Sequence, residues 1–286
     1  MSRRFDTLRE FGDAIKLSHS IFALPFATAA AFLAADGLPA IDVLGKVLLA
    51  CVAARTSAMS FNRVIDADLD AANPRTATRS VPAGRLSRGF MGWATFVSAA
   101  TFVAVAWWIN DLAFLLSPIA LVVLLGYSAT KRFTSLSHIV LGAALGLSPL
   151  GAWIAVRGEF ALEPSLLGLA ILFWTAGFDV IYACQDHDFD RDMGLHSIPR
   201  HLGIGRALWV SRGFHVVALG LLAAVGHVGA YGPFYWSGVA IVGVLLVYEQ
   251  NLVRSDDLSR VNLAFFTLNG LVSVVFMASV ILQVVV

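Results

Sequence analysis

Long apolar segments recur along the whole chain and limit its fold more strongly than any other feature. About 20 apolar residues in a helix cross the hydrocarbon core of a bilayer. The apolar pattern predicts nine such helices, with expected bounds 18–35, 41–62, 89–109, 112–128, 137–156, 165–185, 206–226, 232–250 and 261–284. A soluble core does not require this composition, because 58% of the 286 residues are hydrophobic and 14% are charged. We therefore expect an all-α polytopic membrane protein with nine transmembrane helices.

Basic residues fall mainly in alternate loops between these helices. One set of loops carries Arg63, Arg75, Arg79, Arg85, Arg88, Lys131, Arg132, Arg191, Arg200, Arg206, Arg254 and Arg260. The opposite loops hold Arg157 and Lys46. Cytoplasmic loops of membrane proteins carry the excess of Lys and Arg, so the pattern predicts a cytoplasmic N-terminus on the same face as the basic loops. We expect a multi-pass protein of the inner (plasma) membrane, with an amphipathic N-terminal surface segment rather than a signal peptide.

Two acidic clusters interrupt the apolar chain, each at the cytoplasmic end of a predicted helix. They are residues 66–70 (Asp-Ala-Asp-Leu-Asp) and residues 186–190 (Asp-His-Asp-Phe-Asp). Carboxylates at the edge of a membrane are costly to desolvate and repel one another unless cations neutralise them. Oxygen ligands of this kind suit a divalent metal. The clusters therefore predict a divalent-metal site, and the expected ligand is a polyanion held by that metal.

The two halves of the chain resemble each other around these clusters. The clusters align at an offset of 120 residues, from 66 to 186, and each is followed by a similar tripeptide at residues 80–82 (Ser-Val-Pro) and 197–199 (Ser-Ile-Pro). An ancient duplication of a helix and its acidic loop produces such a pattern, although chance repetition of a short Asp motif also does. We expect one integral-membrane domain over residues 1–286, built from two pseudo-repeated halves.

Helical spacing predicts which side chains share a face. Asn62, Asp66 and Asp70 follow one another at intervals of four residues, so they form one stripe if the helix continues through them. Asp186 and Asp190 form the matching pair. The residues that extend the two stripes into the membrane are Arg55 and Met59 in the first helix, and Asp179 and Tyr182 in the second. A structural ion pair between Arg55 and Asp179 is the alternative to a functional role for these two charges.

Three motifs in a fixed order carry a resemblance to a known family. Residues 62–70 have the form NxxxDxxxD, residues 186–190 have the form DxxxD, and residues 127–132 (Tyr-Ser-Ala-Thr-Lys-Arg) form a basic motif between them. The chain thereby resembles the UbiA superfamily of intramembrane prenyltransferases over nearly its whole length. Residues 177–186 and 196–199 look closest to the 4-hydroxybenzoate polyprenyltransferase branch and its relatives in the futalosine route to menaquinone.

The resemblance implies a UbiA-like bundle of nine helices with cytoplasmic caps over a central cavity, and a Mg²⁺-dependent transfer of a polyprenyl group from polyprenyl diphosphate to an aromatic acid. The implied ligands of about two Mg²⁺ ions are Asn62, Asp66, Asp70, Asp186 and Asp190. Lys131 and Arg132 are implied to act on the departing diphosphate. Further candidates for substrate binding are Arg55, Arg63, Arg75, Arg79, Tyr127, Asp179, Tyr182 and Arg191.

Several alternatives remain open from the sequence. The acceptor is 4-hydroxybenzoate, a dihydroxynaphthoate, or another ring of the homogentisate, haem or chlorophyllide type, and His19 or His138 is a candidate for placing it. A secondary transporter is disfavoured because its polar groups belong near the bilayer midplane. A cation-binding regulatory protein does not require the basic motif. The near-neutral net charge of +1 gives no indication of nucleic-acid binding.

Overall fold

The chain is helical from end to end in the computed structural model, which describes residues 2–286 and the side chains from residue 7 onward. The α-helices are α1 (Ser2–Ala14), α2 (Leu24–Ala35), α3 (Ile41–Ile65), α4 (Ala67–Ala72), α5 (Arg88–Ile109), α6 (Asp111–Thr130), α7 (Ser137–Arg157), α8 (Leu162–Ala183), α9 (His187–Asp192), α10 (Ile198–Leu202), α11 (Ile204–Val228), α12 (Pro233–Leu252) and α13 (Asn269–Val285). Two 3₁₀ segments, η1 (Leu17–Phe22) and η2 (Cys184–Asp186), and one π-helical segment, η3 (Leu263–Leu268), complete the order. The predicted all-α class is confirmed.

Each of the nine predicted spans contains a helix, but the count of nine transmembrane helices is not confirmed. Within residues 2–286, seven helices are long and apolar enough to cross a membrane, or up to eight if one bent pair counts as a span. The seven are Ile41–Ile65, Arg88–Ile109, Asp111–Thr130, Ser137–Arg157, Leu162–Asp192, Ile204–Val228 and Leu263–Val285. The protein is a multi-pass membrane protein by this measure.

The first predicted span, 18–35, is the one that departs most from a continuous helix. The chain forms the 3₁₀ segment η1 and then α2. The bent pair consists of Thr7–Phe22 and Leu24–Ala35, whose axes are inclined at 41°. Pro25 stands in the first turn of α2. Proline has no amide hydrogen and disfavours the helical conformation of the residue before it, so a helix begins at this point more readily than it continues through it.

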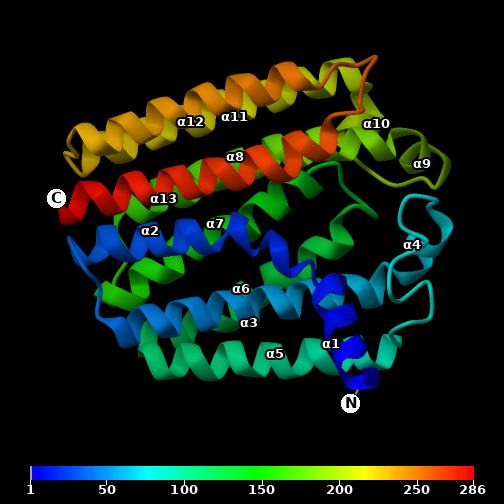
Figure 1. The fold of residues 1–286 in the computed structure, drawn as a ribbon, viewed down its shortest axis with the longest axis horizontal. Coiled ribbons are helices and arrows are strands. Elements are labelled where there is room, and N and C mark those ends of the chain that lie inside the picture. The colour runs from blue at the N-terminus through cyan, green and yellow to red at the C-terminus, as the bar shows by residue number, and fades with distance from the viewer. Residues whose placement is uncertain (1) are drawn as a thin grey trace. The chain divides into compact units, whose positions relative to one another are not determined.

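The chain divides into two compact units. The first comprises residues 1–20 and 49–129, which contain α1, most of α3, α4, α5 and α6. Within it, α3 and α5 lie side by side (Figure 1), and the Ser57 hydroxyl on α3 donates a hydrogen bond to the Thr95 carbonyl on α5 at 3.1 Å. A buried apolar cluster joins α1 to α4 and to the segment after it, and it contains Ala14, Ile15, Ala67, Val81, Leu86 and Met91.

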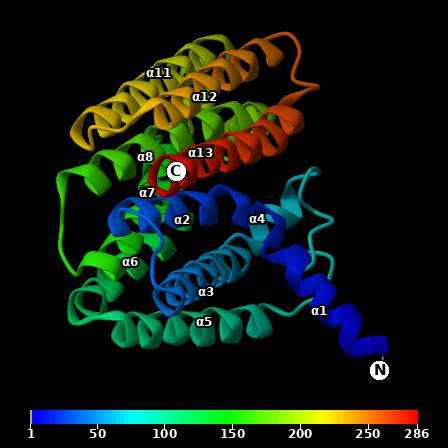
Figure 2. The ribbon, with the colours of Figure 1, turned by 60° about the vertical axis from the view of Figure 1, so that its left-hand side comes forward.

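The second unit comprises residues 21–48 and 130–286. Helix α8 packs against both α7 and α11, while α12 packs against α11 and α13; α11 and α12 run side by side in both views (Figures 1 and 2). Two glycines bring α7 close to α8. A Cβ on Gly142 would lie 2.2 Å from the Leu172 carbonyl oxygen, and one on Gly146 would lie 2.5 Å from that of Gly168. Small residues at a helix crossing allow this approach in a membrane.

Candidate active site

The two acidic clusters have the same local fold. Helix α3 ends at Ile65, and Asp66, with φ −92° and ψ 1°, precedes the six-residue helix α4. Helix α8 ends in the short η2 segment, and Asp186, with φ −102° and ψ 8°, precedes the six-residue helix α9. The bounds of α4 and α9 are 120 residues apart at both ends. Each predicted stripe therefore crosses a break in its helix at the first aspartate of the cluster.

The break does not disrupt the four-residue spacing of the first stripe. The Asp66 amide donates to the Asn62 carbonyl at 3.0 Å, and the Asp70 amide donates to the Asp66 carbonyl at 2.7 Å. The Asn62 side-chain amide also donates to Asp66 Oδ2 at 2.5 Å. These bonds keep the three predicted ligands adjacent, although the helix does not continue through them as a single element.

Asp70 is buried in the first cluster and is held by two guanidinium groups. Arg63 Nη1 lies 3.0 Å from Asp70 Oδ2, and Arg79 Nη1 lies 2.7 Å from Asp70 Oδ1. The Thr76 hydroxyl donates to the Asp70 carbonyl at 3.0 Å. Arg63 is itself only 4% exposed. Both carboxylate oxygens of Asp70 thus have charge-assisted bonds, which are the stronger class of hydrogen bond.

Asp190 is the corresponding carboxylate of the second cluster, and it is fully buried. The Ser197 hydroxyl donates to Asp190 Oδ2 at 2.8 Å. Lys131 Nζ lies 2.7 Å from Oδ1, yet among the described residues Oδ1 has no partner in hydrogen-bond geometry. We regard the contact as an ion pair, because Coulomb attraction does not depend on the bond angle. The His196 amide, in turn, donates to the Lys131 carbonyl at 2.7 Å.

Asp179 lies on α8, on the predicted stripe that continues through Tyr182 to Asp186 in η2. Its Oδ2 lies 2.6 Å from Nδ1 of the buried His138 on α7. The Ile198 amide donates to His138 Nε2 at 3.3 Å, so Nε2 is an acceptor and the proton of a neutral imidazole is on Nδ1. His138 therefore donates to Asp179. Tyr182 packs its ring on Phe265, with the ring centroids 4.2 Å apart.

The remaining predicted residues have varied surroundings. Arg55 donates to the Lys16 carbonyl at 3.1 Å, and the Tyr127 hydroxyl lies 3.8 Å from Met59 Sδ. Arg191 is exposed and pairs with Asp188 at 3.3 Å. Arg75 and Arg132 are also exposed.

Two residues that the sequence did not predict as part of the site form hydrogen bonds to predicted site residues. His138 bonds Asp179, and Ser197 bonds Asp190. His138 was considered only as a candidate for placing the acceptor, and its bond to Asp179 joins residues 41 positions apart, which no local pattern indicates. Ser197 stands in the repeated tripeptide after the second cluster, so the repeat itself was the available signal.

The donor set fits a hard divalent cation. It consists of carboxylate and amide oxygens, which Mg²⁺ prefers to nitrogen or sulfur. Asp190 Oδ1 is a buried carboxylate oxygen that lacks a directional hydrogen bond. Across the part of the chain that the structure describes, however, no group of three or more His, Cys, Asp or Glu side chains gathers as a metal site.

Comparison with known proteins gives relatives along nearly the whole chain. A 4-hydroxybenzoate octaprenyltransferase of Aromatoleum aromaticum is 33% identical over 254 residues, which cover 88% of this chain and 85% of that protein. A 4-hydroxybenzoate solanesyltransferase of Synechocystis is 32% identical, with 76% of this chain and 75% of that protein covered.

Solved structures show the same fold. The apo structure of a UbiA homologue from Aeropyrum pernix matches with a TM-score of 0.84 and 33% identity, covering 92% of this chain and 97% of that one. A UbiA homologue from Archaeoglobus fulgidus, bound to DMAPP and Mg²⁺, matches with a TM-score of 0.73 and 19% identity, covering 96% and 99%. The model of the UbiA prenyltransferase family matches residues 23–278. With the family model, the sequence relatives and the fold in agreement, this chain belongs to the UbiA prenyltransferase family and is a polyprenyltransferase.

Proposed function

We propose that the protein transfers a polyprenyl group from polyprenyl diphosphate to 4-hydroxybenzoate in quinone biosynthesis. The observation that carries this proposal is the pair of buried aspartates, Asp70 and Asp190, each beside a basic side chain within 3.0 Å. Carboxylates beside basic side chains suit a polyanionic ligand with bound metal ions, because the carboxylates bind the metal and the basic groups bind the anion. The names of the two sequence relatives support the acceptor, and their octaprenyl and solanesyl donors leave the length of the tail open.

We propose Mg²⁺ as the cofactor. The residues that would hold it are Asn62, Asp66, Asp70, Asp186 and Asp190. When bound, the metal neutralises the diphosphate and lowers the energy of its departure. The Mg²⁺ and DMAPP bound in the structure of the Archaeoglobus homologue support this choice.

The basic residues of the site provide the second source of positive charge. Arg63 and Arg79 hold Asp70, and Lys131 holds Asp190. When an anionic head group enters, these side chains bind its oxygens and stabilise the charge that develops as the carbon–oxygen bond of the donor breaks. Guanidinium groups match phosphate oxygens in a bidentate manner. Arg132, exposed beside Lys131, is the next candidate for this role or for pairing with the acceptor carboxylate.

Asp179 is proposed to face the acceptor. His138 uses one carboxylate oxygen of Asp179, while the side chain stays 22% exposed. Asp179 is also on the face of α8 that leads to Asp186, seven residues further on in η2. A carboxylate placed in this way is available to a hydroxyl group of the aromatic acid.

The acceptor is tested by incubating the purified protein in lipid with labelled polyprenyl diphosphate and a panel of aromatic acids. We expect prenylated 4-hydroxybenzoate to form, and to form faster than any product from a dihydroxynaphthoate or homogentisate. Asp186→Asn serves as the inactive control. Preferred prenylation of the dihydroxynaphthoate would reassign the acceptor, and absence of prenylated product with every acid would overturn the proposal.

We also propose that both acidic clusters face the cytoplasm across the inner membrane, on the basis of the alternating basic loops. Single cysteines at Thr78, Ser135 or His196, in a protein lacking Cys51 and Cys184, test this orientation. An impermeant thiol reagent applied from the cytoplasmic side is expected to label all three. Labelling from the opposite side would reverse the topology.

A further inference from the structure

Glu249 is a fully buried carboxylic side chain on α12 that lies outside the acidic clusters. Its Oε1 accepts a hydrogen bond from the Asn269 side-chain amide at 2.9 Å. Its other oxygen, Oε2, has no hydrogen-bond partner among the described residues, and neither does Asn269 Oδ1. The two unpartnered atoms belong to the same pair of side chains. Both are oxygens and neither donates while Glu249 is ionised, so a proton on Glu249, a bridging water molecule or a cation is needed to satisfy both.

Asn269 occupies a special position in the backbone. It follows η3, the π-helical segment Leu263–Leu268. In this π-helical segment, called the π-turn below, the backbone hydrogen bonds are shifted by one residue, which displaces carbonyl groups from the regular α-helical pattern. Asn269 Nδ2 lies 3.0 Å from the Ala264 carbonyl oxygen and 3.2 Å from that of Phe265. The Asn269 amide therefore joins the π-turn to Glu249.

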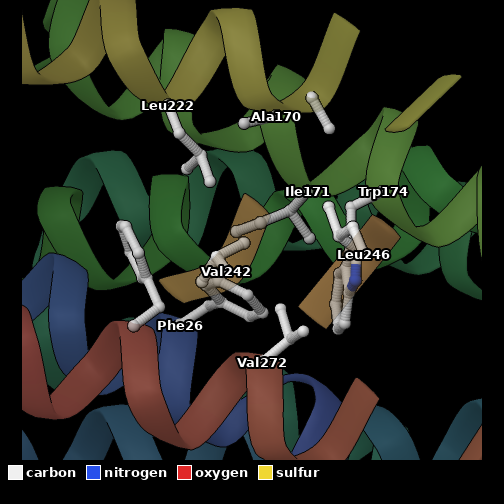
Figure 3. A pocket seen from close by; sticks show the side chains of 10 residues that line it. Phe26, Ala170, Ile171, Trp174, Leu222, Val242, Leu246 and Val272 are labelled. Atoms are coloured by element: carbon white, nitrogen blue, oxygen red, sulfur yellow. The ribbon is translucent and has the colours of Figure 1, made fainter. Parts of the chain in front are cut away.

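The surroundings favour a proton over a charge at Glu249. Leu246, one turn before Glu249, and Val272, one turn after Asn269, line an apolar cavity enclosed by α2, α8, α11, α12 and α13 (Figure 3). On the neighbouring α11, the titratable side chains Arg212 and His215 bond Gln250 instead, and Arg206 and His227 stand near the two ends of the helix. No ion pair of Glu249 occurs in the described part of the chain. A lone carboxylate in such an environment is costly, and the neutral form avoids that cost.

The π-turn leads from Glu249 to the candidate active site. Phe265, whose carbonyl oxygen contacts Asn269, packs on Tyr182 with the ring planes inclined at 34°. Phe265 also contacts Phe178 edge-on, with ring centroids 5.4 Å apart. Tyr182 lies on α8 between Asp179 and the η2 segment that contains Asp186. A change in the π-turn would therefore reach the face of α8 that leads to the second acidic cluster.

We propose that Glu249 is an uncharged carboxylic acid whose Oε2 hydroxyl donates to Asn269 Oδ1, and that this pair fixes the π-turn and so positions Phe265 against Tyr182. Glu249 is a positioning residue in this scheme. Its kinetic consequences rest on the proposed prenyl transfer, whereas its protonation state does not.

Glu249→Gln is the decisive variant. A glutamine amide accepts from Asn269 Nδ2 with its oxygen and donates to Asn269 Oδ1 with its nitrogen, so it reproduces the proposed pair without an ionisable proton. We expect kcat/KM within about twofold of wild type. Glu249→Ala removes both bonds of the proposed pair and leaves Asn269 Oδ1 without a donor, and we expect a loss of roughly tenfold. Phe265→Leu is expected to give a loss of similar size, and the double variant Glu249→Ala with Phe265→Leu should be little worse than either.

Gln250→Leu is the matched control. It removes buried bonds of α12 to Ser211 and His215, so it weakens packing against α11 without touching the π-turn. We expect it to lower thermal stability and to show no coupling with Phe265→Leu. Equal coupling for Gln250→Leu and Glu249→Ala would contradict a specific role of the Glu249 pair.

An infrared difference spectrum between the wild-type protein and Glu249→Gln tests the proton directly and needs no substrate. We expect a carboxylic acid carbonyl band in the wild-type protein that the variant lacks. A carboxylate band in its place, or an inactive Glu249→Gln protein that still folds, would overturn the proposal in favour of a charged or cation-binding Glu249. If wild-type protein shows the carboxylic acid band but prenylates none of the acids, the proposed function fails and this inference stands.

Discussion

The two acidic clusters share a backbone but differ in how their buried aspartates are neutralised. Asp70 is held by two guanidinium groups, one of them almost fully buried. Asp190 is held by one ammonium group, which is 33% exposed, and by a hydroxyl. The second cluster therefore has less fixed positive charge and keeps one carboxylate oxygen without a directional bond. We propose that the protein alone neutralises the buried aspartate of the first cluster, whereas a bound ligand completes the neutralisation in the second.

The largest effect is expected from neutralising either buried aspartate. Asp70→Asn and Asp190→Asn each remove an anionic ligand from the proposed diphosphate site. We expect turnover to fall by about 10²–10³-fold or more in both. Steady-state rates at saturating donor and acceptor measure this loss. Near-normal turnover of either variant would show that the two clusters do not act together on the diphosphate.

A large effect on stability is expected from the first cluster alone. Arg63→Met leaves Asp70 buried with only Arg79, and breaking a buried ion pair costs about 3–5 kcal/mol. Lys131→Met should cost less, because a partly exposed ammonium group is screened by water. Thermal unfolding of the two variants in the same lipid compares them, and Arg191→Met is the exposed control. A larger loss for Lys131→Met than for Arg63→Met would reverse the comparison.

A smaller effect is expected at the hydroxyl that holds Asp190. Ser197→Ala removes a hydrogen bond to a charged group, which is worth about 1.5–3 kcal/mol. Because nothing else bonds Oδ2 in the described residues, we expect a weaker apparent affinity for Mg²⁺ as well. A Mg²⁺ titration of turnover measures it. The Ser197 hydroxyl also accepts a hydrogen bond from the Arg200 amide at the start of α10. An unchanged titration curve would mean that Ser197 acts only as this helix cap.

The smallest effect is expected from the middle aspartates, Asp68 and Asp188, which are exposed. Asp68→Asn should leave turnover within about twofold of wild type, as expected for an exposed ion pair. Its hydrogen bond from Arg88 holds the pKa of the Asp68 carboxyl below the usual value. Any stability from this pair is therefore present above the ordinary aspartate pKa and is lost as the pH falls through the lowered value. A fall in turnover comparable to that of Asp70→Asn would place Asp68 in the site.

Local spacing predicted which side chains of the first acidic cluster are adjacent. The four-residue interval of Asn62, Asp66 and Asp70 is preserved by backbone hydrogen bonds, although the helix breaks at Asp66. The bond between His138 and Asp179 depends on the close packing of α7 on α8 and has no local signal. Hydropathy likewise predicted the positions of the helices but not the bend near Pro25, which depends on the backbone rather than on apolarity.

The central proposal is that both clusters bind one diphosphate through divalent metal. Equilibrium binding of a non-hydrolysable polyprenyl diphosphate analogue, with Mg²⁺ or with EDTA, tests it most directly in the wild-type protein, Asp66→Asn and Asp186→Asn. We predict tight binding to the wild-type protein that EDTA abolishes and Mg²⁺ restores, and a loss of about tenfold or more in each variant. Wild-type affinity in either variant, or binding that survives EDTA unchanged, would contradict the claim.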